Sequence, residues 1–283
     1  MNILIIGKKG MLGHDLVESM KQMPAVTLTA FDREDLDITD REAVESAVTH
    51  LKPDYIFNAA AMTNVDACEE NPIKANLVNA DAVGYLARAA KSVGATLIHY
   101  STDYVFDGAN EEGYAEYDKP NPISEYGKSK YKGEQNALSE SSKIYIVRVC
   151  WLYGKNRENF VDFLANSARN GVPVKLVEDQ FGHPTYTQDI AEKSQLFTGM
   201  TLAQPPCGIY HLFNNGKTSR KEQGEHIFEL LGQRPPQVEY VSVSSFPGKA
   251  PRPKYSILKN TKIADIRDWQ EATKDYLGTM SRT

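Results

Sequence analysis

Short apolar runs alternate with segments of helical periodicity along the first half of the chain. The runs are of strand length and apolar on both faces, which is typical of parallel strands covered on both sides by helices. Between them apolar residues recur every three or four positions, which indicates amphipathic helices. The pattern predicts strands at residues 3–6, 26–31, 55–58, 96–101 and 144–149, and helices at about 11–23, 41–51, 73–93 and 124–141.

From about Trp151 onwards this rhythm loosens and prolines become more frequent. Short strands are expected at 174–177 and 208–213. A last helix is expected at 268–277, with Trp269, Ala272 and Tyr276 turned inward. The short connections of the first half favour an α/β fold with a Rossmann-like, doubly wound parallel sheet. Some later segments are expected to return to that sheet, and the others to form a smaller C-terminal lobe.

Composition narrows the class of protein. The 283 residues include 32 Lys and Arg against 37 Asp and Glu, a formal net charge of -5, so no nucleic-acid partner is expected. No apolar run is long enough to span a bilayer, and the N-terminus does not read as a signal peptide. Cys68, Cys150 and Cys207 lack CxxC spacing, which favours reduced thiols. We therefore expect a cytoplasmic protein with no membrane partner.

A glycine-rich turn joins the first predicted strand to the first predicted helix. Gly7, Gly10 and Gly13 follow that strand in a GxxGxxG spacing. Gly7 and Gly10 permit a tight turn and the close approach of a diphosphate, while Gly13 lets the helix pack on the strand. The helix N-terminus offers free backbone N–H groups to the anion. We therefore expect residues 1–150 to form an NAD(P)-binding Rossmann domain, and residues 151–283 to form mainly a discontinuous substrate-binding lobe.

An acidic and a basic residue follow the second predicted strand. Asp32 lies about 20 residues past the glycine loop, where a carboxylate can bind the ribose hydroxyls of NADH. Arg33 comes next and can instead receive the 2′-phosphate of NADPH. The cofactor is therefore expected to be NADPH or NADH, with use of both as the favoured interpretation.

Two side chains with acid–base chemistry share one face of the predicted helix at 124–141. Tyr126 and Lys130 are four residues apart, and the ammonium is expected to lower the pKa of the phenol from its usual ~10. Lys130 can also hold the nicotinamide ribose. Thr102 brings a hydroxyl to the end of the fourth strand, at the sheet edge where ligands bind in such folds. Glycine loop, strand-end hydroxyl and Tyr-x-x-x-Lys, in this order, predict an oxidoreductase.

Longer motifs carry a more specific resemblance. The most particular are the Ser-Thr-Asp-Tyr-Val-Phe run from Ser101, Trp151 shortly after Arg148, and the Asp-Gln-Phe-Gly segment from Asp179. On these motifs the chain resembles the extended short-chain dehydrogenases, and within them the dTDP-4-dehydrorhamnose reductases, nearly from end to end. The resemblance implies NAD(P)H-dependent reduction of the C4 ketone of dTDP-4-dehydro-L-rhamnose to dTDP-L-rhamnose, a step of nucleotide-sugar and cell-surface polysaccharide biosynthesis.

The resemblance also implies roles for single residues. Tyr126 would protonate O4 and Thr102 would hydrogen-bond the same oxygen. Asp103 and Trp151 would contact the sugar, the indole against its apolar face, and Arg252 would clamp the diphosphate. With the glycine loop included, the residues expected to hold the cofactor are Gly7, Gly10, Met11, Leu12, Gly13, Asp32, Arg33, Asp37, Ile38, Ala61, Met62, Thr63, Tyr126 and Lys130.

Some positions depart from the family pattern. Some relatives bind Mg²⁺ through glutamates at a dimer interface, whereas Asp15 and Gln188 stand at the matching positions here, so no metal is expected. Cys150 replaces the usual small hydroxylic residue or alanine, so the pocket wall can differ. The expected partner is a dTDP-sugar substrate, and the expected assembly is a monomer or homodimer.

Two other functions stay open on the sequence. A related nucleotide-sugar 4-ketoreductase or epimerase would use the same three catalytic residues. Regulatory subunits of this fold bind NADP without turning over a substrate. The intact Thr102, Tyr126 and Lys130 favour an enzyme.

Overall fold

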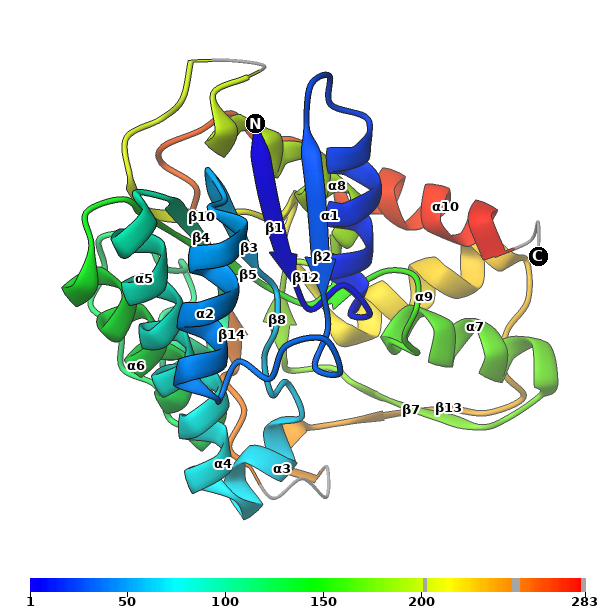
Figure 1. Cartoon of the computed structure of the whole chain (residues 1–283). Coiled ribbons are helices and arrows are strands. Elements are labelled where there is room, and N and C mark those ends of the chain that lie inside the picture. Colours follow the sequence, from blue (N-terminus) through cyan, green and yellow to red (C-terminus); the bar gives the residue numbers. More distant parts are fainter. Residues whose placement is uncertain (201–202, 246–249, 281–283) are drawn as a thin grey trace.

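The computed structural model, shown in Figure 1, describes residues 1–200, 203–245 and 250–280. Its main sheet is parallel throughout and has six strands in the order β10-β5-β4-β3-β1-β2. The α/β class and the doubly wound, Rossmann-like sheet are therefore as predicted. The strands are β1 (Asn2–Ile6), β2 (Thr27–Phe31), β3 (Tyr55–Asn58), β4 (Thr96–Thr102), β5 (Ile144–Val149) and β10 (Gly208–His211).

Helices cover both faces of this sheet because successive strand residues point to opposite sides. In β1, Ile3 and Ile5 belong to one buried cluster, whereas Leu4 and Ile6 belong to the other. The first cluster includes side chains of α1 (Met11–Lys21) and α8 (Thr187–Ser194), and the second those of α2 (Arg41–Leu51), α5 (Ala82–Val93) and α6 (Glu125–Glu140).

The helix predicted at 73–93 is confirmed, but it contains a π-helical turn that the prediction lacked. Helices α3 (Val65–Glu70) and α4 (Pro72–Asn76) lead into a π-helical turn, η1 (Leu77–Asp81), before α5 begins. Apolar spacing does not register the extra residue of a π turn, and such turns are frequent at functional sites. Here the turn lets the Asn79 side chain accept the backbone N–H of Met62 at 2.8 Å and donate to its carbonyl at 3.0 Å.

The strand order reverses between β1 and β3, which in open α/β sheets marks the ligand-binding crevice. Gly7 leaves β1 with φ 90°, a conformation that favours glycine. A Cβ on Gly7 would come within 2.8 Å of the backbone nitrogen of Ala60, just past β3. A Cβ on Gly13 would come within 1.9 Å of the Gly7 carbonyl oxygen. The glycines therefore let the chain after β1, the start of α1 and the chain after β3 lie in direct contact.

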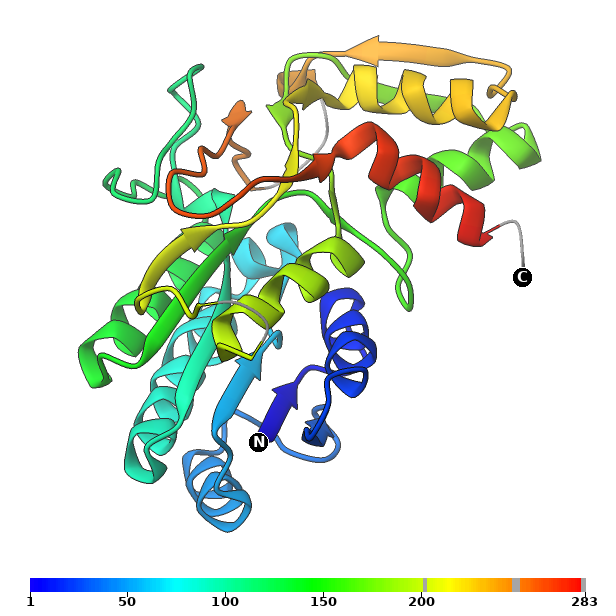
Figure 2. The same cartoon turned by 90° about the horizontal axis from the view of Figure 1, so that it is seen from above.

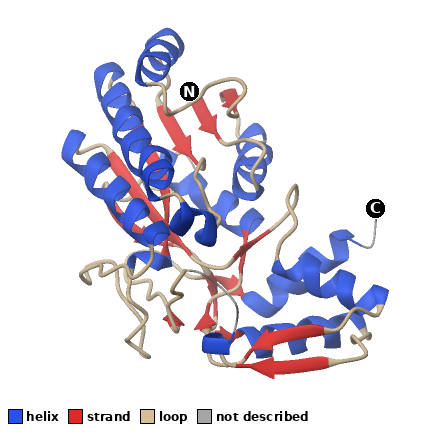
Figure 3. Cartoon of the chain, turned by 90° about the horizontal axis from the view of Figure 1, so that it is seen from below, coloured by secondary structure: helices blue, strands red, loops and turns tan. Residues whose placement is uncertain are grey.

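The second half of the chain contributes to two regions. β10 pairs with β5, so a segment beyond residue 150 extends the sheet. Other helices and strands form a separate group beside it, seen in Figures 2 and 3, with a buried core of their own. The group includes α7 (Phe160–Asn170), β7 (Val174–Val177), α9 (Arg220–Leu231), β13 (Val238–Val241) and α10 (Trp269–Met280).

The expected inward positions Trp269, Ala272 and Tyr276 of α10 are all buried, as predicted. The domain boundary near residue 150 stays a prediction, and residues 281–283 of the expected lobe lie outside the described residues. The remaining elements are η2 (Asp103–Val105), β6 (Leu152–Tyr153), β8 (Phe181–Gly182), β9 (Thr185–Tyr186), η3 (Gln195–Thr198), β11 (Asn214–Asn215), β12 (Thr218–Ser219), η4 (Val243–Ser245), β14 (Tyr255–Ser256) and β15 (Ile266–Asp268).

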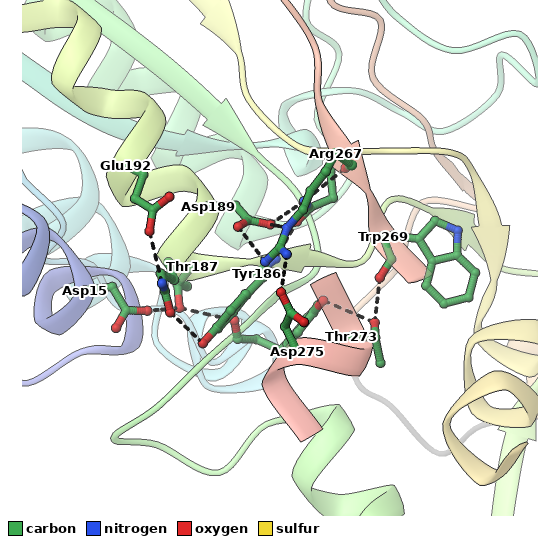
Figure 4. Close-up of polar contacts among 12 residues, drawn as sticks. Asp15, Tyr186, Thr187, Asp189, Glu192, Arg267, Trp269, Thr273 and Asp275 are labelled. Atoms are coloured by element: carbon green, nitrogen blue, oxygen red, sulfur yellow. Dashed lines mark hydrogen bonds and ion pairs between the residues drawn. The ribbon is translucent and has the colours of Figure 1, made fainter. Parts of the chain in front are cut away.

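A polar network, drawn in Figure 4, links helices from both halves of the chain. Arg267 of β15 donates to both carboxylate oxygens of Asp189 on α8, at 3.0 and 2.9 Å, and also pairs with Asp275 on α10. The hydroxyl of Thr187 donates to Asp15 on α1. Helix α8, which packs on the helix that follows the glycine loop, is thereby fixed to the C-terminal helix.

Candidate active site

A cavity of about 520 Å³ opens where the carboxyl ends of β1 to β5 meet. It is lined by every residue that the sequence predicted to hold the cofactor, from the glycine loop to Tyr126 and Lys130 on α6. Thr102, Asp103, Trp151 and Arg252 do not line it. Further lining residues that sequence reasoning missed include Lys74, Ser101, Leu152 and Arg157.

The start of α1 fits the diphosphate of a dinucleotide. Its N-cap, Gly10, makes no side-chain hydrogen bond to the first turn, and that turn contains no acidic residue. The first N–H groups of a helix have no partner within the helix and carry the positive end of its dipole. Met11, Leu12 and Gly13 of this turn all line the cavity, so an anion placed there meets uncapped donors.

Asp32 and Arg33 occupy different environments at the end of β2. The Asp32 carboxylate accepts the backbone N–H groups of Lys9 and Arg33, both at 2.8 Å, and so ties the glycine loop to β2. Sequence reasoning missed this structural role. The Arg33 side chain is 76% exposed and only approaches Asp37, at 3.7 Å. The guanidinium is therefore available to a phosphate at the mouth of the cavity.

We expect Arg33→Ala to shift cofactor preference toward NADH. Loss of a charge contact with the 2′-phosphate should lower kcat/KM for NADPH roughly tenfold and leave that for NADH unchanged. Steady-state kinetics with both cofactors measure the ratio. An unchanged ratio would mean that Arg33 points to solvent in the cofactor complex. Asp32→Asn is the opposing variant and should favour NADPH.

Helix α6 is held close to the cavity by contacts that require glycine. Ser124 caps its N-terminus by accepting the Gly127 N–H at 3.2 Å. A Cβ on Gly127 would lie 2.2 Å from the Tyr104 carbonyl oxygen, and one on Gly133 would lie 2.1 Å from that of Asn79. These close approaches place the face that carries Tyr126 and Lys130 at the end of β4.

Lys130 is buried and its ammonium turns toward β4. Nζ donates to the carbonyl oxygen of Tyr100 at 2.6 Å and lies 3.3 Å from Nε2 of His99. Burial lowers the pKa of Lys130 to about 8. His99, also fully buried, has its other ring nitrogen 3.1 Å from the amide nitrogen of Asn58. Sequence reasoning missed that His99 contacts Lys130.

The expected lowering of the Tyr126 pKa is wrong for the protein alone. Burial raises the pKa of the phenol above its usual value, and the Thr102 hydroxyl offsets only part of the rise. The ammonium of Lys130 makes its hydrogen bonds to Tyr100 and His99 instead. Tyr126 is therefore protonated at neutral pH, as an ordinary phenol is, and burial makes it a weaker acid in the protein alone.

Thr102 and Asp103 lie beside Tyr126 at the end of β4. The Thr102 hydroxyl donates to Oδ1 of Asp103 at 2.8 Å. The other carboxylate oxygen, Oδ2, is buried and makes no hydrogen bond within the described residues, as is also true of Trp151 Nε1 and Ser256 Oγ. Burial raises the pKa of Asp103 to about 6. A buried polar atom without a hydrogen-bond partner costs free energy, and such atoms are found where a protein binds a ligand that has hydroxyl groups.

Asp103→Asn is expected to stabilise the fold at neutral pH. A folded-state pKa of about 6, against 3.8 in the unfolded chain, means that ionisation of Asp103 destabilises the fold. This cost is absent below pH ~4 and fully present above pH ~6, where it amounts to about 2–3 kcal/mol. Urea unfolding should show the variant more stable at pH 7 and equal to the original at pH 4. A constant difference across this range would contradict the buried-carboxylate account.

The structure changes the interpretation of Trp151. The guanidinium carbon of Arg220 lies 3.5 Å from the centroid of the indole ring and so covers one of its faces. The ring also packs against Gly182, where a Cβ would come within 2.6 Å of it. The face that Arg220 covers is therefore not open to a sugar, and the expected contact between Trp151 and the sugar stays a prediction. Trp151 has φ 44°, which is uncommon for a bulky residue and fixes the direction of the chain after β5.

Arg252 does not stand free for a diphosphate in this structure. Its Nη2 forms an ion pair with Asp66 at 3.0 Å, and Nη1 donates to the Ala250 carbonyl at 3.2 Å. Arg220 takes up the position beside the candidate substrate residues, and sequence reasoning missed it. Ser219 and Glu222 form a capping box that marks the start of α9, but nothing local connects Arg220 to Trp151.

The sheet, the switch-point cavity and Tyr126 with Lys130 define an oxidoreductase of the extended short-chain dehydrogenase/reductase class. The family model described as the RmlD substrate binding domain matches residues 1–282. The chain therefore belongs to this family, that of the dTDP-4-dehydrorhamnose reductases, which confirms the resemblance.

Individual relatives match over nearly the full chain. A dTDP-4-dehydrorhamnose reductase from Streptomyces griseus is 37% identical, with 95% of this chain and 90% of the relative covered. A solved reductase of the same name from Clostridium acetobutylicum has a TM-score of 0.93 at 38% identity, covering 99% of this chain and 100% of the other. The Bacillus anthracis reductase, solved in complex with NADP, has a TM-score of 0.92 at 34% identity, covering 98% and 99%.

Asp15 and Gln188, at the positions where some relatives bind Mg²⁺, both make hydrogen bonds to other side chains. Asp15 accepts from Thr187, and Gln188 accepts from Tyr186 and donates to Glu192. Over the described ranges, no three His, Cys, Asp or Glu side chains are grouped so that they could hold a metal ion. In the same ranges, no helix has the length and apolar character needed to cross a membrane.

Proposed function

We propose that this protein reduces the C4 ketone of dTDP-4-dehydro-L-rhamnose to dTDP-L-rhamnose, using NADPH or NADH. The observation that carries the proposal is the cavity, which joins the glycine loop after β1 to Tyr126 and Lys130 on α6. Thr102 and Asp103 lie at the same sheet edge, next to Tyr126. Relatives named for this reaction, one of them solved with NADP, support the same assignment.

The proposed chemistry divides between the cofactor and three side chains. When bound, the reduced nicotinamide supplies a hydride to the ketone carbon. Tyr126, which is protonated at neutral pH, donates its phenolic proton to O4. Lys130 holds the nicotinamide ribose and, by its positive charge, favours the phenolate that remains. Thr102 turns its hydroxyl from Asp103 toward O4, which leaves the Asp103 carboxylate to accept from the sugar hydroxyls.

The test is turnover with the purified 4-keto sugar nucleotide and each reduced cofactor. The expected result is consumption of one NADPH or NADH per dTDP-L-rhamnose formed. An epimerase would interconvert sugar nucleotides without net consumption of the reduced cofactor. A regulatory subunit would bind NADPH but show no turnover. Either of those two results would overturn the proposal in favour of the corresponding alternative.

The finer expectations belong to the same proposal. We propose a cytoplasmic protein that takes a dTDP-sugar from solution and acts as a monomer or homodimer. The predicted domains, 1–150 for the cofactor and mainly 151–283 for the substrate, agree with the separate core shared by α7, α9 and α10. Light scattering on the eluting protein distinguishes the two assemblies, and a higher oligomer would contradict both.

A further inference from the structure

Arg220 holds an unusual position between the two groups of elements. It is the first residue of α9, yet its guanidinium stacks on the Trp151 ring after β5 and lies 4.7 Å from the centroid of the Phe160 ring. Asp103 and Tyr104 lie near enough for their negative charge, when ionised, to raise the pKa of Arg220. Tyr104 in turn packs edge-on against Tyr126, with ring centroids 5.6 Å apart. Arg220 therefore lies close to the residues that surround Tyr126, and it does not line the cofactor cavity.

Most N–H groups of the Arg220 guanidinium make no hydrogen bond to the described residues. Nη1 donates to the side-chain oxygen of Gln223 at 3.1 Å. Nε and Nη2 make no hydrogen bond, and no carboxylate forms an ion pair with Arg220, among the residues that the structure describes. Burial against the aromatic rings meanwhile lowers the pKa of Arg220 to about 10. The positive charge is thus partly desolvated, and the buried Asp103 carboxylate lies near it without forming an ion pair.

Stacking leaves the hydrogen-bonding edge of a guanidinium open. An arginine that lies flat on an aromatic ring still presents its N–H groups in its own plane, where they match the oxygens of a phosphate. Arg252, which the sequence favoured as the diphosphate clamp, already has Asp66 as its partner. Trp151 thus holds Arg220 in a fixed orientation, while Nε and Nη2 make no hydrogen bond among the described residues.

We propose that Arg220 binds the diphosphate of the sugar nucleotide, with Trp151 as the platform that orients its guanidinium. The assignment rests on the proposed function, because the diphosphate is the anionic part of that substrate. It gives Trp151 an indirect role as a positioning residue in place of direct stacking on the sugar. Asp103 Oδ2, which is buried and makes no hydrogen bond among the described residues, is then left for the sugar hydroxyls.

Calorimetric binding of dTDP and of thymidine tests the assignment without requiring turnover. Arg220→Gln should weaken dTDP binding about 10- to 100-fold, the scale of a lost charge-assisted hydrogen-bond pair. Thymidine, which has no phosphate, and NADPH should bind both proteins equally. Arg220→Lys, which keeps the charge but not the fork, should give an intermediate loss. Lys221→Gln is the matched control, because Lys221 is the next residue of α9 and pairs with Glu178.

Kinetics separate this inference from the proposed function. KM for the 4-keto sugar nucleotide should rise by the same factor as the dTDP Kd, with kcat within about twofold, because uniform binding is removed. An unchanged dTDP Kd in Arg220→Gln, a loss confined to the sugar nucleotide, or equal losses of dTDP, thymidine and NADPH would each overturn the inference. If the wild type shows no turnover but its dTDP binding depends on Arg220, the proposed function fails and the diphosphate site stands.

Discussion

Replacing Tyr126 with phenylalanine is expected to lower turnover by about 10²–10⁴-fold, the usual contribution of one general acid. Tyr126 lines the cavity and is the proposed proton donor, because its phenol carries a proton at neutral pH. Phenylalanine preserves the aromatic contact with Tyr104, so the helix should stay where it is. The measurement is single-turnover reduction of the 4-keto sugar nucleotide at saturating NADPH.

Tyr104→Phe is the matched control for this variant. Tyr104 is also buried and packs on Tyr126, but it is not the predicted donor. Removing the Tyr104 hydroxyl should lower turnover far less than removing the Tyr126 hydroxyl. NADPH affinity should be nearly unchanged in both variants. Near-normal turnover of Tyr126→Phe would remove Tyr126 from the proposed chemistry.

Glu134→Ala is expected to destabilise the fold by about 3–5 kcal/mol, because it leaves the Arg148 charge buried and unpaired. Glu134 on α6 accepts from Nε and Nη2 of Arg148 on β5, at 2.9 and 2.7 Å, and both side chains are 1% exposed. The Ser101 hydroxyl of β4 donates to the same carboxylate. The pair therefore fixes the helix of Tyr126 to the two strands that end at the site.

A second glutamate of α6, Glu140, forms an exposed ion pair that can be compared with the buried Glu134 pair. Glu140 pairs with Arg88, and the Arg88 side chain of that pair is 47% exposed. Exposed ion pairs contribute little, so Glu140→Ala should cost less than about 1 kcal/mol. Urea unfolding followed by circular dichroism measures both variants. Equal losses would show that burial of the Glu134 pair does not decide its contribution.

Local signals predicted many of the residues that line the cavity at the end of the sheet. The spacing of Gly7, Gly10 and Gly13 and the four-residue step from Tyr126 to Lys130 depend on neighbours in sequence, which a strand–turn–helix pattern places directly. The alternation of apolar runs predicted five strands of the sheet to within a few residues, because both faces of a doubly wound sheet are buried. These predictions needed no knowledge of contacts between distant segments.

Long-range packing decided what the sequence could not predict. Arg220 stacks on Trp151, 69 positions earlier, and no periodicity relates the two. The Tyr126 pKa moves opposite to the expected direction because the phenol is buried, while the Lys130 ammonium lies against Tyr100 and His99. Asn79, which contacts Met62, lies in a π turn that apolar spacing does not predict. In each case residues distant in the sequence determine the surroundings of the side chain, and local patterns do not reveal them.

The destination of the hydride is the most direct test of the proposed reduction. With NADPH that carries deuterium at its transferable position, and dTDP-4-dehydro-L-rhamnose as substrate, the product should be dTDP-L-rhamnose with deuterium at C4. Proton magnetic resonance would then show the H4 signal missing and the other ring protons intact. Product with ordinary hydrogen at C4, deuterium at another carbon, or no product from a protein that binds NADPH would contradict the account.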